Sequence, residues 1–244
     1  MQKELRMKLN KQKKIVTMFD EIAKTYDLAN RVLSFGVDTI WRKKACDLTF
    51  GYYGKKEIDL IADVACGTGD MCIYWDKRAK NANIDIKNII GIDPSQGMLE
   101  EAKNKDINAK FIKGEAKDLP LENESVDIVS ISYGLRNVVD RIEGLNEFNR
   151  VLKKGGMLVI LEFTKLQKAT LMSKIRDFYM KKILPFVGGL LSKNYEAYNY
   201  LPNSIEGFLT KEKLIKELES CGFEVLKAKG YSMDISTLFI AKKI

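Results

Sequence analysis

The sequence of 244 residues contains no histidine, and this absence excludes several kinds of active site. Without histidine there is no Ser-His-Asp or Cys-His catalytic arrangement and no His-ligated metal ion. The commonest general base of enzymes is missing as well. Any chemistry must therefore use carboxylates, tyrosine, lysine, arginine, water or a cofactor.

Cysteines and long apolar runs are scarce too. The four cysteines, Cys46, Cys66, Cys72 and Cys221, form no CxxC pair and no metal-like cluster, so we expect reduced thiols and no metal site. No apolar run approaches the ~20 residues that span a bilayer, and the basic stretch 1–14 lacks the apolar core of a signal peptide. These absences predict a cytoplasmic protein.

The composition is that of a globular protein, with 45% hydrophobic and 30% charged residues. The length suits one α/β domain over residues 1–244. The formal net charge of +8 is compatible with a nucleic acid, an anionic membrane or an anionic ligand as partner. A purely solvated basic surface explains it equally well.

Apolar strands and amphipathic helices alternate along most of the chain. We expect strands at 58–65, 88–93, 109–114, 126–132, 157–163, 223–228 and 236–242. Helices are expected at 16–26, from about 38, and at 70–80, 95–103, 142–152 and 211–220. Parallel strands need crossover helices, so this alternation predicts an α/β fold with a doubly wound seven-stranded sheet. The last two strands form an antiparallel pair at one edge, residues 1–50 form a helical cap, and 165–209 form a helical insertion.

A glycine-containing turn, Asp63-Val-Ala-Cys-Gly67-Thr68-Gly69-Asp70, joins the first strand to a helix. Gly67 and Gly69 let the backbone approach a ligand, and the helix N-terminus supplies free N–H groups. Asp93 ends the second strand, where a carboxylate can bind both ribose hydroxyls of an adenosine. Together with Asp63, these residues predict a site for an adenosine-containing cofactor.

The turn lacks the third glycine of a dinucleotide site. Asp70 at the helix start would repel a pyrophosphate, whereas it suits a cofactor that carries a sulfonium and an ammonium group. The pattern therefore favours S-adenosylmethionine, with NAD as the alternative. Glu115 and Ala116, in the turn after the third strand, are candidates for reading the adenine edge.

Two motifs further along the chain carry a family resemblance. They are Tyr133-Gly-Leu-Arg136-Asn137-Val and Tyr198-x-Tyr200-Leu-Pro-x-Ser204-Ile. With Met-Phe-Asp-Glu-Ile-Ala at 18–23, Tyr-Asp at 26–27, Trp-Arg at 41–42 and the glycine turn, the sequence resembles the menaquinone/ubiquinone biosynthesis C-methyltransferases over nearly its whole length. The resemblance implies a class I S-adenosylmethionine-dependent methyltransferase fold. It also implies cofactor contacts at Thr68, Asp93, Glu115, Ala116 and Ser132.

The resemblance further implies an acceptor and a mechanism. The acceptor is a polyprenyl hydroquinone, with demethylmenaquinol preferred and a ubiquinone-pathway benzoquinol as the alternative. A ring carbon beside a hydroxyl becomes nucleophilic when that hydroxyl loses its proton. Arg136 and Asn137 are the candidates for stabilising the phenolate, and water or Tyr26 for removing the proton.

The insertion contains a basic amphipathic stretch, 171–191, with Lys174, Ile175, Phe178 and Phe186. Such a stretch can form a lid over a tail channel and contact an anionic lipid surface transiently, placing the protein at the inner face of the membrane. No nucleic-acid module is evident, so an RNA methyltransferase is the weaker alternative, as is a non-catalytic cofactor-binding scaffold. The sequence leaves a homodimer open.

Overall fold

The protein contains a seven-stranded mixed sheet with strand order β3-β2-β1-β4-β5-β7-β6. The computed structural model describes residues 2–166, 179–192, 194–232 and 234–244. The strands are β1 (Glu57–Val64), β2 (Asp85–Asp93), β3 (Lys110–Lys113), β4 (Val126–Ser132), β5 (Leu152–Glu162), β6 (Phe223–Tyr231) and β7 (Ser236–Lys243). The first five run parallel, and β7 lies antiparallel between β5 and β6. This confirms the predicted fold class and the antiparallel pair at one edge.

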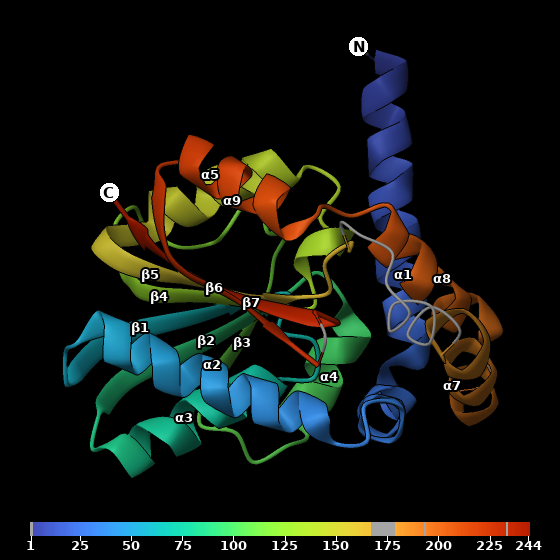
Figure 1. Ribbon diagram of the computed structural model, residues 1–244, viewed down its shortest axis with the longest axis horizontal. Coiled ribbons are helices and arrows are strands. Elements are labelled where there is room, and N and C mark those ends of the chain that lie inside the picture. The colour runs from blue at the N-terminus through green and yellow to red at the C-terminus, as the bar shows by residue number, and fades with distance from the viewer. Residues whose placement is uncertain (1, 167–178, 193, 233) are drawn as a thin grey trace.

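Helices cover both faces of the sheet (Figure 1). On one face lie α2 (Val37–Tyr53) and α3 (Asp70–Ala82), and on the other lie α5 (Arg141–Val151) and α9 (Lys211–Ser220). Successive strand residues point to opposite faces, so Ile61 joins the core under α2 and α3 while Ala62 joins the core under α5 and α9. The remaining crossover helix, α4 (Gln96–Lys103), joins β2 to β3.

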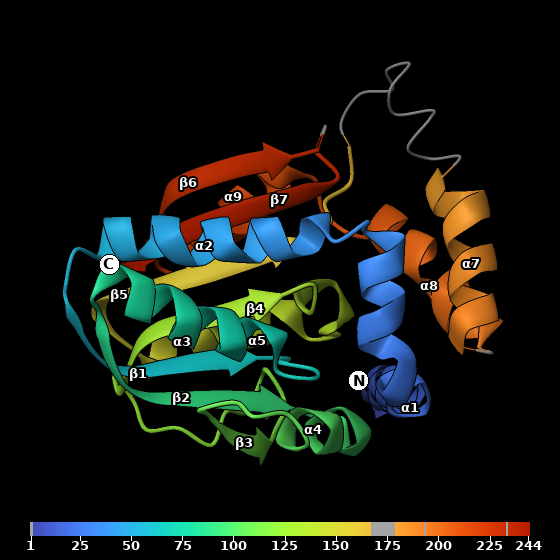
Figure 2. The same ribbon diagram turned by 90° about the horizontal axis from the view of Figure 1, so that it is seen from below.

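A third layer of helices stands at the carboxyl ends of the parallel strands (Figure 2). It comprises α1 (Gln2–Leu33), the short π-helix η2 (Tyr179–Ile183), α7 (Leu184–Ser192) and α8 (Tyr195–Glu206). Ile22 and Leu33 of α1 pack with Tyr198 of α8 in a separate apolar cluster. The N-terminal helix and the segment 179–206 thus meet over the edge of the sheet where open α/β folds bind ligands.

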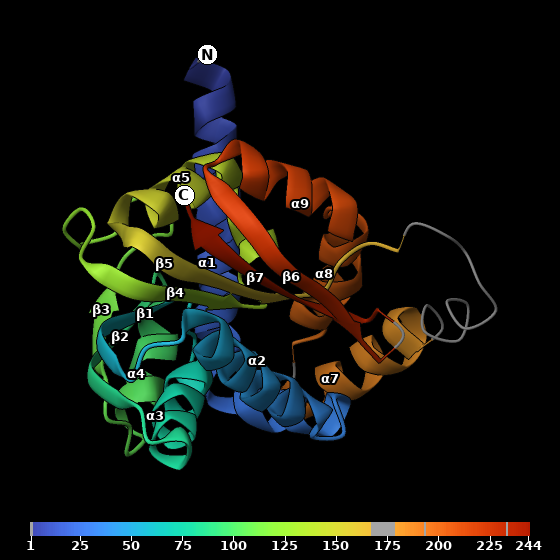
Figure 3. The ribbon, with the colours of Figure 1, turned by 60° about the vertical axis from the view of Figure 1, so that its left-hand side comes forward.

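The N-terminal helix is longer than expected. Apolar spacing predicted a helix at 16–26, whereas α1 begins at Gln2 and ends at Leu33. Its first half is too polar to show an amphipathic period, but lysine, glutamate, glutamine and leucine are good helix formers, so the helix continues. That half extends beyond the sheet domain (Figure 3).

Two helix ends are stabilised by local features. Ser95 caps α4, accepting a hydrogen bond from the Met98 N–H at 3.1 Å. Gly222 follows α9 with a left-handed φ of 82°. Within the described part of the chain we find no helix with the length and apolarity needed to cross a membrane.

Candidate functional site

Two cavities share a wall at the carboxyl ends of the strands. The first is lined by residues that follow β1, β2, β3 and β4, together with the inner face of α1. The second lies between α1, α2 and α8 and has a volume of about 350 Å³. Phe19, Tyr26 and Tyr133 line both cavities, so three aromatic rings form the boundary between them.

Five of the eight predicted cofactor residues line the first cavity. These are Gly67, Asp93, Glu115, Ala116 and Ser132. They come from four separate turns that the parallel strands bring to one edge of the sheet. The other three, Asp63, Thr68 and Gly69, are not among the residues that line this cavity.

The glycine turn needs glycine for steric reasons. Gly67 and Gly69 have left-handed φ values of 55° and 80°. A Cβ on Gly69 would lie 2.8 Å from the Cδ1 atom of Ile107 and 3.0 Å from the ring of Phe111, so a larger residue would displace both side chains. The Gly67 N–H donates to Oδ2 of Asp93 at 2.8 Å, which joins the turn to the end of β2.

Asp93 is a buried carboxylate at the floor of the first cavity. Its Oδ1 accepts a hydrogen bond from the Ser95 N–H at 2.8 Å, and its Oδ2 accepts the bond from Gly67. Burial raises the pKa of Asp93 to about 6, although these backbone hydrogen bonds oppose the shift. Each oxygen keeps a lone pair, so Asp93 can accept two further hydrogen bonds from a ligand.

Asp63 faces the interior of the sheet domain instead. Its Oδ1 accepts a hydrogen bond from the Ser130 hydroxyl at 2.6 Å, and Ser130 in turn accepts one from the indole N–H of Trp75 at 3.0 Å. Burial raises the pKa of Asp63 to about 7. The geometry therefore gives Asp63 a supporting position under α3, and a direct cofactor contact stays a prediction without geometric support.

We expect the stability of Asp63→Asn to depend less on pH than that of the wild type. Folded wild-type protein keeps the Asp63 proton up to about pH 7, whereas an ordinary aspartate releases it near 3.8. The free energy of unfolding therefore falls as the pH rises between these values, and asparagine removes that contribution. Thermal unfolding from about pH 5 to pH 8 measures the slope, with the exposed Asp85→Asn as control. Equal slopes for wild type and Asp63→Asn would contradict this assignment.

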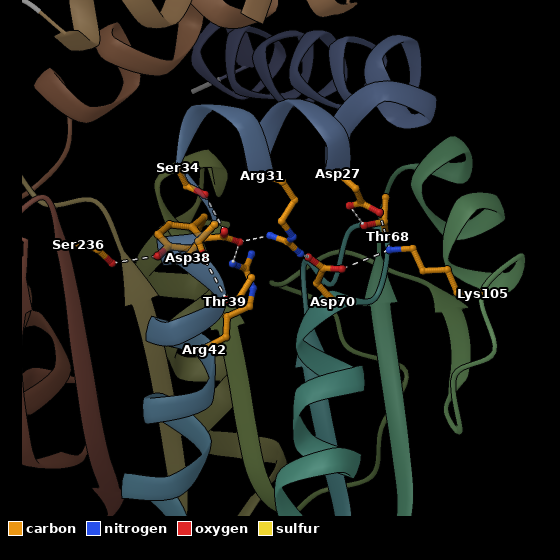
Figure 4. Close-up of polar contacts among 12 residues, drawn as sticks. Asp27, Arg31, Ser34, Asp38, Thr39, Arg42, Thr68, Asp70, Lys105 and Ser236 are labelled. Atoms are coloured by element: carbon orange, nitrogen blue, oxygen red, sulfur yellow. Dashed lines mark hydrogen bonds and ion pairs between the residues drawn. The ribbon is translucent and has the colours of Figure 1, made fainter.

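Asp70 also takes a different place from the one expected. It forms ion pairs with Arg31 of α1 and, at 3.3 Å, with Lys105. Arg31 binds Asp38 of α2 as well, so its guanidinium joins α1, α2 and α3 (Figure 4). The prediction that Asp70 faces a sulfonium or an ammonium group is not supported, because its carboxylate is held by two cations outside the cavity lining.

Two further acidic residues attach α1 to the cofactor side of the sheet. Asp27 accepts a hydrogen bond from the Thr68 hydroxyl at 2.6 Å, and Asp20 accepts bonds from Ser95 Oγ at 2.5 Å and from the Gly97 N–H at 2.9 Å. Sequence reasoning missed both roles. The residues stood in the N-terminal motif, but nothing in the local pattern showed their partners.

We expect Thr68→Val and Asp27→Ala each to weaken cofactor binding several-fold. Their hydrogen bond holds α1 as the outer wall of the first cavity, so either change loosens the same contact. The double variant should then lose no more affinity than the single variant that binds the cofactor less tightly. Calorimetric titration with S-adenosylmethionine gives the four affinities of the cycle. Additive losses would instead indicate that Thr68 contacts the ligand itself.

The predicted catalytic residues divide between the cavities. Arg136 lines the second cavity and Asn137 the first, while Tyr26 lines both. Arg136 and Asn137 belong to η1 (Leu135–Asn137), the short 3₁₀ turn after β4. Two adjacent residues of one turn therefore line different cavities.

Arg136 is held in a buried ion pair. Its Nη1 donates to Oε1 of Glu162 at 2.7 Å and to the Tyr133 carbonyl at 2.5 Å, and its guanidinium carbon lies 5.4 Å from the centre of the Phe163 ring. The Glu162 side chain is fully buried. These contacts fix the direction of the guanidinium, and sequence reasoning did not identify Glu162 as its partner.

The motif that begins at Tyr198, in the insertion, contacts the same turn. The Tyr200 hydroxyl donates to Oδ1 of Asn137 at 3.0 Å, and Nε of Arg136 donates to the Ser204 hydroxyl at 3.2 Å. Tyr198 and Tyr200 both line the second cavity. The two motifs that carried the family resemblance thus bind one another across 63 residues of chain.

Comparisons with known proteins show which proteins this chain is similar to. The sequence profile of the ubiE/COQ5 methyltransferase family matches residues 6–243. The chain is 57% identical to "Ubiquinone/menaquinone biosynthesis C-methyltransferase UbiE" of Campylobacter jejuni, over 97% of this chain and 100% of that protein. It is 40% identical to "Demethylmenaquinone methyltransferase" of Thermotoga maritima, over 87% of this chain and 89% of that protein.

A solved structure shows the same fold. It is a SAM-dependent methyltransferase of Thermotoga maritima, described as a possible histamine N-methyltransferase. The TM-score is 0.64 at 20% identity, and the match covers 93% of this chain and 99% of that one. At this identity the likeness concerns the fold alone.

Proposed function

The chain belongs to the ubiE/COQ5 methyltransferase family, and from that premise we propose that its acceptor is demethylmenaquinol. It is an S-adenosylmethionine-dependent C-methyltransferase of quinone biosynthesis. Menaquinone is the quinone shared by the names of the Campylobacter and Thermotoga relatives. A naphthoquinol is therefore preferred over a benzoquinol.

The residues of the first cavity fit S-adenosylmethionine. Asp93 offers two oxygens to the ribose hydroxyls, and Glu115 and Ala116 present a carboxylate and backbone groups to the adenine side. When bound, S-adenosylmethionine supplies an electrophilic methyl group on a sulfonium. The aromatic boundary suits a cation, because a sulfonium is attracted to the faces of tyrosine and phenylalanine rings.

The shared boundary is the observation that supports methyl transfer between the cavities. A cofactor in the first cavity and a ring in the second would meet at Phe19, Tyr26 and Tyr133. Two reactants held in contact avoid most of the entropic cost of a bimolecular encounter. The second cavity is lined largely by aromatic and aliphatic side chains, as a flat apolar ring requires.

Arg136 and Tyr26 have complementary parts in the proposed mechanism. The Arg136 guanidinium stabilises the acceptor oxygen as it loses its proton, so that the neighbouring ring carbon gains nucleophilicity. Burial raises the pKa of Tyr26, although Asn30, Arg136 and Arg42 oppose the shift. A protonated Tyr26 suits a hydrogen-bond donor to the phenolate better than a base, which leaves water to remove the proton.

Transfer of radiolabelled methyl from S-adenosylmethionine to an acceptor tests the function. We expect label on chemically reduced demethylmenaquinol, much less on a benzoquinol of equal tail length, and none on the oxidised quinone, which lacks an ionisable hydroxyl. Label on the benzoquinol alone would overturn the choice of ring. Binding of S-adenosylmethionine without transfer to any quinol would overturn the acceptor class.

We also propose that the described part of the 165–209 insertion acts with residues 1–50 as a lid that contacts an anionic membrane surface. Phe35, Phe186 and Leu190 are 81%, 64% and 64% exposed. The exposed residues Lys182 and Ile183 lie close to Phe186 and Leu190 in the sequence. Phe35 lines the second cavity and its ring centre lies 6.4 Å from that of Tyr179 at the start of η2. Apolar side chains beside a cavity for a tailed ring suit the boundary of a bilayer.

Sedimentation with vesicles tests this contact. We expect Phe186→Ser with Leu190→Ser to bind anionic vesicles less than the wild type does and to lose activity on long-tailed quinol in vesicles. Activity on a soluble short-tailed quinol should persist. Ile142→Ser, at an exposed position of α5, is the matched control. Unchanged vesicle binding would exclude α7 as the contact.

Lys174, Ile175 and Phe178, which the sequence also placed in this stretch, lie outside the described residues.

A further inference from the structure

Two buried polar atoms of the second cavity have no hydrogen-bond partner. In the described part of the chain, three buried side-chain polar atoms are unpartnered, and two of them belong to lining residues of this cavity: Nε of Arg42 and the Tyr198 hydroxyl. A buried polar group without a partner costs free energy, so it calls for a ligand or a functional reason. Arg42 has no place in the mechanism described above.

Two contacts fix the Arg42 guanidinium. Its Nη1 donates to Oδ2 of Asp38 at 2.8 Å, and its Cζ lies 5.1 Å from the centre of the Tyr133 ring. Asp38 is itself held by Ser34 Oγ at 2.7 Å and by Arg31 (Figure 4). The side chain is 8% exposed. The Nε–H is therefore a rigid donor, and it can only donate.

The acceptor chemistry requires a second oxygen contact. In a 1,4-dihydroxynaphthalene, the ring carbon that receives the methyl group is activated only when the adjacent hydroxyl ionises. The other hydroxyl, beside the carbon that carries the prenyl tail, does not activate it. An enzyme must recognise this remote hydroxyl to present the correct edge of the ring to the methyl group.

We propose that Arg42 is a positioning residue that binds the remote hydroxyl of the acceptor through its Nε–H. This inference rests on the proposed function. Arg136 serves the oxygen beside the acceptor carbon, and both arginines line the same cavity. Arg42 thereby determines which edge of the ring meets the methyl group and favours diols over mono-ols.

Lysine at position 42 removes this donor selectively. In lysine a methylene stands where arginine has its Nε–H, while the terminal ammonium can still pair with Asp38. Two acceptors are compared: a short-tailed 1,4-diol, and the naphthol that keeps the hydroxyl beside the acceptor carbon but lacks the remote one. Label transfer with each gives kcat/KM for the wild type and for Arg42→Lys.

We expect kcat/KM of the wild type to be at least about tenfold higher for the diol, which corresponds to one hydrogen bond to a charged group. Arg42→Lys should reduce this preference to within about threefold, because it lowers kcat/KM for the diol much more than kcat/KM for the mono-ol. Arg141→Lys is the matched control, because Arg141 also pairs with an acid, Glu217, and lies 5.4 Å from the ring centre of Phe208 but lines neither cavity. It should keep the wild-type preference.

Each other outcome has a defined meaning. Equal losses on both acceptors in Arg42→Lys, or no preference in the wild type, would overturn the inference and leave the proposed function standing. Absence of transfer to any naphthol by the wild type would overturn the proposed function and the inference together. If Arg42→Lys does not fold, Arg42→Met with Asp38→Asn removes the Nε–H donor together with both charges of the ion pair and gives the same comparison.

Discussion

Turnover should fall about a hundredfold or more when Arg136→Gln is combined with Glu162→Gln, while S-adenosylmethionine affinity stays within about threefold of the wild type. The Arg136 guanidinium lines the second cavity from the turn after β4, and removing one such stabilising group costs rate mainly in the chemical step. Single-turnover label transfer to the diol, together with a binding titration, separates the two quantities.

The double variant separates a loss of catalysis from a loss of stability. Arg136→Ala alone would leave the fully buried Glu162 carboxylate unpaired, which typically costs about 3–5 kcal/mol of stability. Two glutamines shorten the side chain at position 136 but leave no buried charge. Glu162→Gln alone is the control, because the Arg136 guanidinium then still donates to the Tyr133 carbonyl and the Ser204 hydroxyl. For it we expect activity within about tenfold of the wild type. Near-normal turnover in the double variant would show that the guanidinium only holds the structure.

Asp93→Asn should weaken S-adenosylmethionine binding about a hundredfold, because each hydrogen bond to a carboxylate contributes about 1.5–3 kcal/mol. The amide NH₂ would also face one of the two backbone N–H groups that now donate to the carboxylate, those of Gly67 and Ser95. Calorimetric titration measures the loss, and Asp85→Asn at the exposed start of β2 is the matched control. An affinity equal to that of the control would exclude Asp93 from the cofactor site.

The pH dependence of binding gives the same residue a second test. The pKa of Asp93 is raised to about 6 by burial, and only the ionised carboxylate accepts two ribose hydrogen bonds. Wild-type affinity should therefore be constant above about pH 7 and fall up to about tenfold for each pH unit below 6. Asp93→Asn should show no such fall, and a parallel fall in both proteins would assign the titration to another group.

Much of the fold follows from local pattern. The alternation of apolar strands and amphipathic helices predicted the sheet and its seven strands, because burial imposes periods of 2 and 3.6 on the sequence. The glycine turn and Asp93 were also recognisable, since a left-handed φ favours glycine and the strand end sets the position of the acid. The largest differences are the length of α1 and the early start of β5 at Leu152, where polar residues obscure the apolar period.

The sequence by itself determined the fold class, the cofactor edge of the sheet and the residues of the turn after β4. Tertiary structure alone decided how the site is assembled: the boundary of Phe19, Tyr26 and Tyr133, the pairing of Arg136 with Glu162, and the unpartnered Nε of Arg42. Local periodicity reports which face of an element is buried. It carries no information about which distant side chain lies opposite, because that contact depends on how helices and strands pack in three dimensions.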